Sequence, residues 1–293
     1  MLHLVKLEPA RGPLSSSPLI SVCVPARNEE RGIRACLESL LRQDYPRFEV
    51  IAVDDNSTDA TPAIVESLAA GDPRLTLARG EALPEGWFGK PYALHQAYRR
   101  AQGEYLLFTD ADPAFRPFAL TAAMYVMRRD NLDVLTLLPG TEFGSFWERA
   151  VQPVIFGFIA ALTRFRKVNG RDHPDAMGIG AFMLFRRDAY ERIGGHERVR
   201  QEIVEDIALA KCAKREGLNL LIADGKRVYS IRMYHSFREI WLGWRKNMFV
   251  AMKQSVARTL YYISAVLCFV AAPYLTFFAN LALGAGSFWT AVS

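Results

Sequence analysis

Short apolar runs that end in polar residues alternate with stretches of helical periodicity along the first part of the chain. The run LISVCVPA at residues 19–26 has the β-rich composition of a buried strand, and residues 29–41 then place apolar side chains at helical spacing. The same order returns further along the chain. Strands are predicted at residues 19–26, 48–53, 75–78 and 105–109, and helices at 29–41, 61–70 and 91–101. This alternation predicts an α/β fold with a mostly parallel sheet and helices on both faces.

Polar residues occupy the positions directly after several of the predicted strands. In open parallel sheets, ligands bind beyond the carboxyl ends of the strands, so these positions bear on function. They are Arg27, Asn28 and Glu29 after the first strand, Asp54 and Asp55 after the second, and Asp110 and Asp112 after the strand at 105–109. A polar loop is ordinary by itself, but their joint placement at one edge of one sheet predicts a binding site.

Asp110 and Asp112 form an Asp-x-Asp pair just past a strand. Alternating residues can direct two carboxylates toward one hard cation, and Mg²⁺ or Mn²⁺ held there could bridge a diphosphate. Such a cation neutralises the charge that builds on a departing nucleoside diphosphate. The alternative is a solvated turn, for which the adjacent Pro113 supplies a structural reason.

Asp54 and Asp55 place two adjacent carboxylates after a buried strand, where they repel each other unless a hydrogen-bond donor or a cation is close. A nucleobase N–H and ribose hydroxyls are suitable partners for a carboxylate in this position. The alternative is that both acids are solvated, and that Asn56, Ser57 or Asp59 caps the following helix.

Glu205 and Asp206 lie among apolar residues with helical spacing. An acid in such surroundings can have its pKa moved toward neutrality, which suits a general base that deprotonates an acceptor hydroxyl. The alternative is a pair of capping acids in the first turn of a helix, where the helix dipole favours carboxylates.

The end of the chain is uncharged and follows a basic stretch. No charged residue occurs from Thr259 through Ser293, which exceeds the roughly 20 residues of a bilayer-spanning helix. The preceding basic residues are Lys226, Arg227, Arg232, Arg238, Arg245, Lys246, Lys253 and Arg258. We therefore expect a juxtamembrane and transmembrane segment at 251–293, with the preceding domain on the cytoplasmic side of the cell inner membrane. The net charge of +5 is then explained without a nucleic-acid partner.

The cysteines and histidines show no spacing that indicates a metal site. Cys23, Cys36, Cys212 and Cys268 are expected as free thiols in a reducing compartment, and His95, His173 and His235 are given no role. The start of the chain has no basic region leading into a long apolar run, so no signal peptide is evident.

Residues 146–165 (FWERAVQPVIFGFIAALTRF) are mostly apolar, but their uncharged part is too short to span a bilayer easily. We expect an interfacial helix lying on the membrane, with a buried core helix as the alternative.

Ordered motifs in this chain resemble the inverting family 2 glycosyltransferases of GT-A fold. They are SVCVPARNEE (21–30), VIAVDDNSTDAT (50–61), GEYLLFTDAD (103–112), MGIGAFMLFRRDAYERIGGHE (177–197) and VEDIALA (204–210). The resemblance covers roughly residues 18–250. It implies a Rossmann-like GT-A domain there, preceded by an N-terminal extension at 1–17 and followed by the segment at 251–293.

The resemblance also implies a role for each matching residue. The donor-binding residues would be Pro25, Arg27, Asn28, Glu29, Asp54, Asp55, Lys90 and Asp110, with Asp55 reading the base. The metal ligands for Mg²⁺ or Mn²⁺ would be Asp112 and Asp110, with Asp112 the more direct. The catalytic residues would be Asp206, as the base, and Glu205, while His196 and Glu197 would lie in the acceptor loop.

LPEGWFGKPYA (83–93) and SFREIWLGWRKNMF (236–249) resemble a branch that includes hopene-associated and carotenoid-type glycosyltransferases, which implies a polyisoprenoid or other lipid acceptor. Processive polysaccharide synthases and ceramide glucosyltransferases carry a Gln/Arg-x-x-Arg-Trp motif instead. The nearest residues here are Trp244 and Arg245, in reversed order, so they are acceptor-side candidates with an aromatic-basic membrane belt as the alternative.

The function expected from the sequence is inverting transfer of a sugar from a nucleotide diphosphate donor, a UDP-sugar, to a lipid at the cytoplasmic membrane face. A polysaccharide or ceramide-type membrane glycosyltransferase is the nearest alternative. A nucleotidyltransferase would carry a glycine-rich signature after the first strand, where PARNEERG is poor in glycine. A catalytically inactive membrane scaffold is the alternative from another class, and the retained acidic motifs argue against it.

Overall fold

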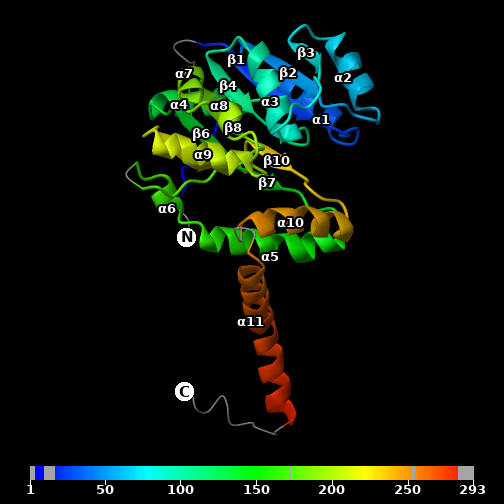
Figure 1. Cartoon of the computed structure of the whole chain (residues 1–293), viewed down its shortest axis with the longest axis vertical. Helices are drawn as coiled ribbons and strands as arrows, with labels where there is room; N and C mark the ends of the chain where they lie inside the picture. The colour runs from blue at the N-terminus through cyan, green and yellow to red at the C-terminus, as the bar shows by residue number, and fades with distance from the viewer. Residues whose placement is uncertain (1–3, 10–16, 172, 252–254, 283–293) are drawn as a thin grey trace. The chain divides into compact units, whose positions relative to one another are not determined.

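The computed structural model describes residues 4–9, 17–171, 173–251 and 255–282 (Figure 1). The chain divides into two compact units, Met1–Ile240 and Trp241–Ser293. The first unit carries the sheets and both cavities described below.

The described residues form strands and helices that alternate along most of the first unit. The strands are β1 (Ile20–Ala26), β2 (Phe48–Asp54), β3 (Leu75–Arg79), β4 (Tyr105–Phe108), β5 (Ala114–Phe115), β6 (Val134–Leu138), β7 (Gly140–Thr141), β8 (Met183–Arg186), β9 (Leu220–Asp224) and β10 (Tyr229–Ile231). The helices are α1 (Ile33–Leu41), α2 (Thr61–Ala69), α3 (Gly89–Arg100), α4 (Ala119–Arg129), α5 (Phe146–Leu162), α6 (Phe165–Val168), α7 (Arg187–Arg192), α8 (Gly195–Arg198), α9 (Glu205–Arg215), α10 (Phe237–Ala251) and α11 (Val256–Ala282).

The main sheet has the strand order β3-β2-β1-β4-β8-β6-β9. Strand β1 pairs in parallel with β2 and β4, and β2–β3 and β6–β9 are also parallel. Strand β8 runs antiparallel to both of its neighbours, β4 and β6. A smaller sheet has the order β5-β10-β7. The sequence pattern therefore found the α/β class, while β8 makes the main sheet mixed.

Helices cover both faces of the main sheet because its strands are apolar on both sides (Figure 1). Ile20, Val22 and Val24 of β1 pack into the core that includes α1, α2 and α4. Cys23 of the same strand points the other way, into the core that includes α3, α7 and α9. This alternation with a period of two leaves the strand ends, rather than the sheet faces, open to ligands.

The structure corrects the expectation of a C-terminal transmembrane segment. Among the residues that the structure describes, no helix is both long enough and apolar enough to cross a membrane, and this includes α11. The expectation counted missing charges, but an uncharged stretch is not uniformly apolar, and this one contains Tyr261, Ser264 and Thr276. Residues 283–293 lie outside the described residues. The predicted cytoplasmic location of the domain can no longer rest on a membrane-spanning helix, and it stays a prediction from the pattern of basic residues.

Candidate active site

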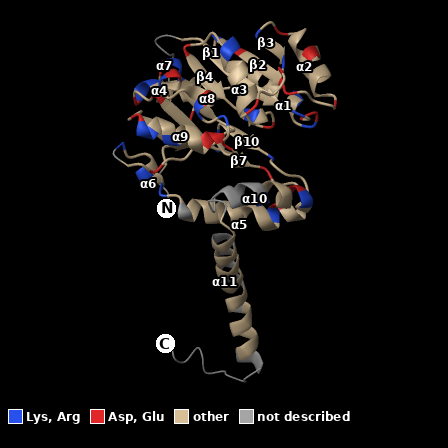
Figure 2. Cartoon of the chain, viewed as in Figure 1, with Lys and Arg blue, Asp and Glu red and all other residues tan. Residues whose placement is uncertain are grey.

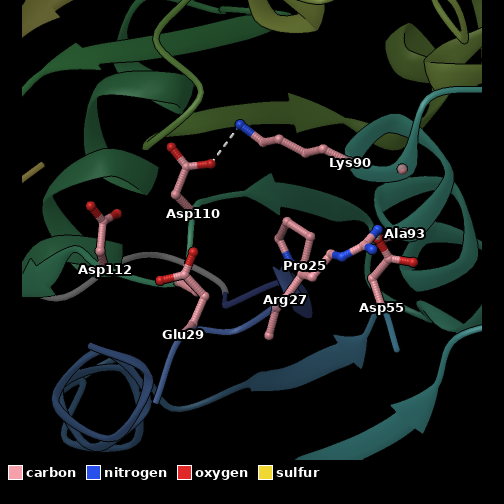
Figure 3. Close-up of a pocket in the computed structure, with 11 residues that line it drawn as sticks. Pro25, Arg27, Glu29, Asp55, Lys90, Ala93, Asp110 and Asp112 are labelled. Carbon is pink, nitrogen blue, oxygen red and sulfur yellow. Dashed lines mark hydrogen bonds and ion pairs between the residues drawn. The ribbon is translucent and has the colours of Figure 1, made fainter. Parts of the chain in front are cut away.

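A cavity of about 310 Å³ lies at the carboxyl ends of β1, β2 and β4 (Figure 3). Its lining comes from these three strand ends and from the first turns of α3: Pro25, Ala26, Arg27, Glu29, Asp55, Gly89, Lys90, Ala93, Asp110, Ala111 and Asp112. Figure 3 shows Asp110, Asp112 and Glu29 on one side of the cavity and Arg27 with Asp55 on the other. Most of the donor-site candidates named from the sequence are thus brought together.

The loops after β1 and β2 hold each other in place through reciprocal hydrogen bonds. The side chain of Asn28 accepts from the backbone N–H of Thr58 at 2.8 Å, and the backbone N–H of Glu29 donates to the Thr61 hydroxyl at 2.7 Å. Asn28 adopts φ 57°, a left-handed conformation that asparagine tolerates better than most residues. These hydrogen bonds hold residues 28 and 29 in the loop, and α1 begins only at Ile33. Asn28 therefore positions the loop beside the cavity.

The adjacent acids Asp54 and Asp55 have different surroundings. Asp54 accepts a hydrogen bond from the backbone N–H of Ser57 at 3.2 Å and pairs with Arg79 at 3.2 Å. Asp55 lines the cavity and pairs with Arg27 at 3.5 Å. Asp54 is therefore placed to stabilise the loop, whereas Asp55 faces the space that a ligand would fill.

Lys90 connects the strand-end acids to α9. Its ammonium lies 2.6 Å from a carboxylate oxygen of Asp110 and 2.7 Å from one of Glu205. Burial opposes the charge on Lys90, but the nearby carboxylates of Asp110, Glu205 and Asp206 outweigh it and raise the pKa of Lys90 well above its usual value. Lys90 is therefore a fixed positive charge between the two groups of acids.

The carboxylates of Asp110, Asp112 and Glu29 supply oxygen ligands of the kind that Mg²⁺ and Mn²⁺ prefer. Burial, followed by the charges of Asp110 and Glu29, raises the pKa of Asp112 to about 7. A divalent cation would relieve this repulsion, so the residues present fit such an ion. Within the described residues no three His, Cys, Asp or Glu side chains are grouped so as to hold a metal ion, whereas Mg²⁺ is commonly bound by only one or two carboxylates and keeps several water ligands.

Asp206 lies in the first turn of α9, where it lines neither cavity but is close to Gly180 and Lys90. Its carboxylate accepts hydrogen bonds of 2.7 Å from the backbone N–H groups of Gly180 and Ile207. Burial and then the charge of Glu205 raise the pKa of Asp206 to about 7. A carboxylate with this pKa is suited to take a proton near neutral pH.

Gly180 is a site residue that the sequence reading did not single out. A Cβ on Gly180 would lie 3.2 Å from Nζ of Lys90, 3.3 Å from Oδ2 of Asp206 and 3.7 Å from Oδ2 of Asp110. A side chain at this position would therefore crowd Lys90, Asp206 and Asp110, and the glycine lets these groups lie close together. The Gly-x-Gly sequence at 178–180, just before β8, was the available signal.

A second cavity of about 660 Å³ adjoins the first, because Glu29 and Asp112 line both. Its other walls include Asn28, the end of β10 and the segment that follows it, with Arg232, His235 and Glu239. His235 was given no role from the sequence. It is far from Asp112 along the chain, so the sequence did not indicate that both residues line one cavity.

The remaining candidates lie elsewhere. His196 is buried, with its ring Nδ1 2.7 Å from the hydroxyl of Tyr190, and burial, followed by the charge of Lys90, lowers the pKa of His196 to about 3. Glu197 is exposed and lines neither cavity. Trp244 and Arg245 belong to the second unit. The acceptor-side assignments of these residues stay predictions.

Comparison with protein families gives a match to the model of glycosyl transferase family 2 over residues 21–194. This match confirms the resemblance that the ordered motifs indicated.

Two curated relatives share one name and come from Staphylococcus aureus. The 4,4'-diaponeurosporenoate glycosyltransferase of strain MRSA252 is 27% identical over 235 residues, which cover 78% of this chain and 60% of the relative. That of strain USA300 is 26% identical over 234 residues, with the same coverage. The chain thus spans about 60% of the length of these relatives.

Solved structures give the same fold. The mannosyltransferase PcManGT from Pyrobaculum calidifontis, in complex with GDP-Man and Mn²⁺, has 25% identity and a TM-score of 0.60, over 81% of this chain and 62% of that one. Residues 1–349 of S. aureus TarS have 24% identity and a TM-score of 0.54, over 73% of this chain and 60% of that one, which supports the fold alone.

Proposed function

Because the chain belongs to glycosyl transferase family 2, we propose that it transfers a sugar from a nucleoside diphosphate to a lipid acceptor with inversion at the anomeric carbon. The observation that carries this proposal is that Lys90 pairs with Asp110 at the end of β4 and with Glu205 in the first turn of α9, directly before Asp206. A Cβ on Gly180 would lie within 4 Å of Lys90, Asp206 and Asp110, so these side chains are close together. A donor held by the strand-end acids would present its sugar to a base on α9.

The donor would be held by residues of the first cavity. Asp55 and Arg27 lie at the end suited to a base and ribose, since a carboxylate accepts N–H and hydroxyl donors. Asp112 and Asp110 would hold a divalent cation, which supplies charge neutralisation for the leaving diphosphate when bound. The GDP-Man and Mn²⁺ bound to PcManGT support a nucleotide-sugar donor and a metal, and a UDP-sugar remains the donor that we propose.

Asp206 would act as the general base. It removes the proton from the acceptor oxygen while that oxygen attacks the anomeric carbon, and the bond from that carbon to the diphosphate oxygen breaks. The hydrogen bonds from Gly180 and Ile207 fix the carboxylate during this step. Lys90 keeps positive charge beside Asp110 and Glu205, so the acids around the sugar do not all repel the incoming donor.

A lipid acceptor is supported by the S. aureus relatives, whose name gives 4,4'-diaponeurosporenoate, a carotenoid-type lipid. Polymer synthesis of the polysaccharide-synthase type is less well supported, because the Gln/Arg-x-x-Arg-Trp motif is absent from the sequence around Trp244.

The experiment is a transfer assay with purified full chain, Mn²⁺, a panel of UDP- and GDP-sugars, and polyisoprenoid or carotenoid acceptors in detergent. We expect release of nucleoside diphosphate together with a glycosylated lipid detected by mass spectrometry. Release of diphosphate without any lipid product would contradict the lipid acceptor. No release with any donor would support the inactive scaffold instead.

A further inference from the structure

The outer face of α5 is apolar and open. Phe146, Trp147 and Val154 are 73%, 48% and 63% exposed, although residues of this kind are normally buried. The smaller exposed residues along the helix are also uncharged: Ala150, Pro153, Gly157 and Ala161. These residues recur at helical spacing and form one stripe, which we call the α5 surface. Figure 2 shows α5 free of charged residues over most of its length.

The α5 surface belongs to a helix that is fixed in place at its N-terminus. Ser145 and Glu148 form a capping box, and Glu148 has no exposed surface. Its two carboxylate oxygens accept hydrogen bonds of 3.0 Å from the guanidinium of Arg232, and these bonds hold the pKa of Glu148 well below its usual value. Because Arg232 follows β10, the pair joins α5 to the smaller sheet.

Aromatic side chains at one end of the α5 surface and basic side chains beside it give a composition suited to the headgroup region of a bilayer. The ring of Trp147 lies 5.3 Å from that of Phe146 and 5.0 Å from that of Phe237. Arg149 on α5 and Arg238 beside Phe237 are exposed. Their charges would attract anionic lipid headgroups, whereas the only acid of α5, Glu148, is buried against Arg232.

Helix α5 is also connected to the candidate active site. Arg232, which binds Glu148 of α5, lines the larger cavity, and that cavity shares Asp112 with the donor cavity. The buried side of α5 is therefore joined through Arg232 to the larger cavity, while the α5 surface faces away from it.

We propose that the α5 surface rests on an anionic lipid bilayer and presents the acceptor from it. The delivery of an acceptor rests on the proposed function, but the binding of the bilayer needs no catalysis. Failure of sugar transfer and failure of membrane docking can therefore be told apart.

The test places an environment-sensitive fluorophore on the α5 surface of the full chain. Cys23, Cys36 and Cys212 are buried and Cys268 is exposed, so Cys268→Ser removes the exposed native thiol and Val154→Cys provides the labelling site. The matched control carries the label through Tyr125→Cys on α4, which is 39% exposed. Vesicles contain phosphatidylcholine alone or phosphatidylcholine with phosphatidylglycerol.

We expect a blue shift and a severalfold rise in emission at position 154 with the anionic vesicles, little change with neutral vesicles, and none at position 125. Because the label reports its own position, vesicle binding by another segment does not produce this signal. No shift at position 154, or equal shifts at both positions, would overturn the proposal. A shift at 154 before vesicles are added, with the mass of a dimer in solution, would overturn it in favour of self-association.

A second measurement uses unlabelled protein. Phe146→Ser with Trp147→Ser should lower the affinity for anionic vesicles about tenfold or more, because large apolar side chains are lost from the contact. An unchanged affinity in a variant that melts at the wild-type temperature would count against the α5 surface.

Discussion

Lys90 and Glu205 form an ion pair of 2.7 Å in which the Glu205 side chain is only 6% exposed. Glu205 is therefore positioned to act through Lys90 rather than on a substrate, while its neighbour Asp206 accepts a hydrogen bond of 2.7 Å from the backbone N–H of Gly180. The pair connects α3 with α9, two helices that are distant in the sequence and cover the same face of the sheet.

Glu205→Gln should lower the turnover number about tenfold to a hundredfold, because Lys90 would lose one of the two carboxylates that hold it. Steady-state kinetics with a saturating donor measures this. Glu205→Asp should recover only part of the loss, since its shorter side chain changes the distance to Lys90. A variant with unchanged turnover would show that the pair does not position Lys90.

Turnover should fall as the pH decreases through about 7, because Asp206 must be deprotonated to accept a proton and its raised pKa lies there. The charged groups that face Asp206 are Glu205, whose charge raises its pKa, and Lys90, whose charge lowers it. Glu205→Gln should therefore move the acidic limb to lower pH, and Lys90→Met should move it to higher pH. A pH profile of turnover for the wild type and the two variants checks both directions. Acidic limbs that coincide in all three proteins would show that the limb does not report the protonation of Asp206.

Substitution of Asp54 should affect the stability of the fold, whereas substitution of Asp55 should affect donor binding. Asp54→Asn should lower the free energy of unfolding by roughly 1–2 kcal/mol, because it weakens the contacts with Arg79 and the backbone of Ser57. Asp55→Asn should leave stability nearly unchanged and weaken nucleotide binding by roughly 1–3 kcal/mol. Thermal melting and calorimetric titration with UDP measure the two effects. The reverse assignment would contradict the surroundings described for the two acids.

Gly180→Ala should abolish most turnover while leaving UDP binding close to that of the wild type. The added methyl group would lie 3.2 Å from Nζ of Lys90 and 3.3 Å from Oδ2 of Asp206 and would displace both groups, at a position away from Asp55. Gly71→Ala is the matched control, because a Cβ there meets only the carbonyl oxygen of Leu68, at an ordinary 3.5 Å. Equal activity of the two variants would show that the reaction does not depend on the close approach of Lys90 and Asp206 at Gly180.

The sequence could predict the strand-end acids because their positions depend on local pattern. The strands before Arg27, Asp55 and Asp110 are short apolar runs, and parallel strands end at the same edge. The Lys90–Glu205 pair could not be predicted in this way, since it depends on how α3 and α9 pack against the sheet.

Other differences have equally physical causes. The antiparallel β8 resembles a parallel strand in sequence, because both are apolar when buried on two faces. The sequence offered no basis for different roles of Asp54 and Asp55. The difference depends on the hydrogen bonds that Asp54 accepts from Ser57 and Arg79 in the folded structure. The length of uncharged sequence at the end of the chain overstated its apolar character.

The most direct test of sugar transfer compares Asp206→Asn with the wild type in two measurements on the same preparation, donor binding in the presence of Mn²⁺ and turnover with a lipid acceptor. Asparagine keeps the size of the side chain but cannot accept the acceptor proton, so donor affinity should be retained while turnover falls by about 10²–10⁴-fold. Turnover close to that of the wild type would contradict the assignment of Asp206 as the base and, with it, the mechanism proposed for this site.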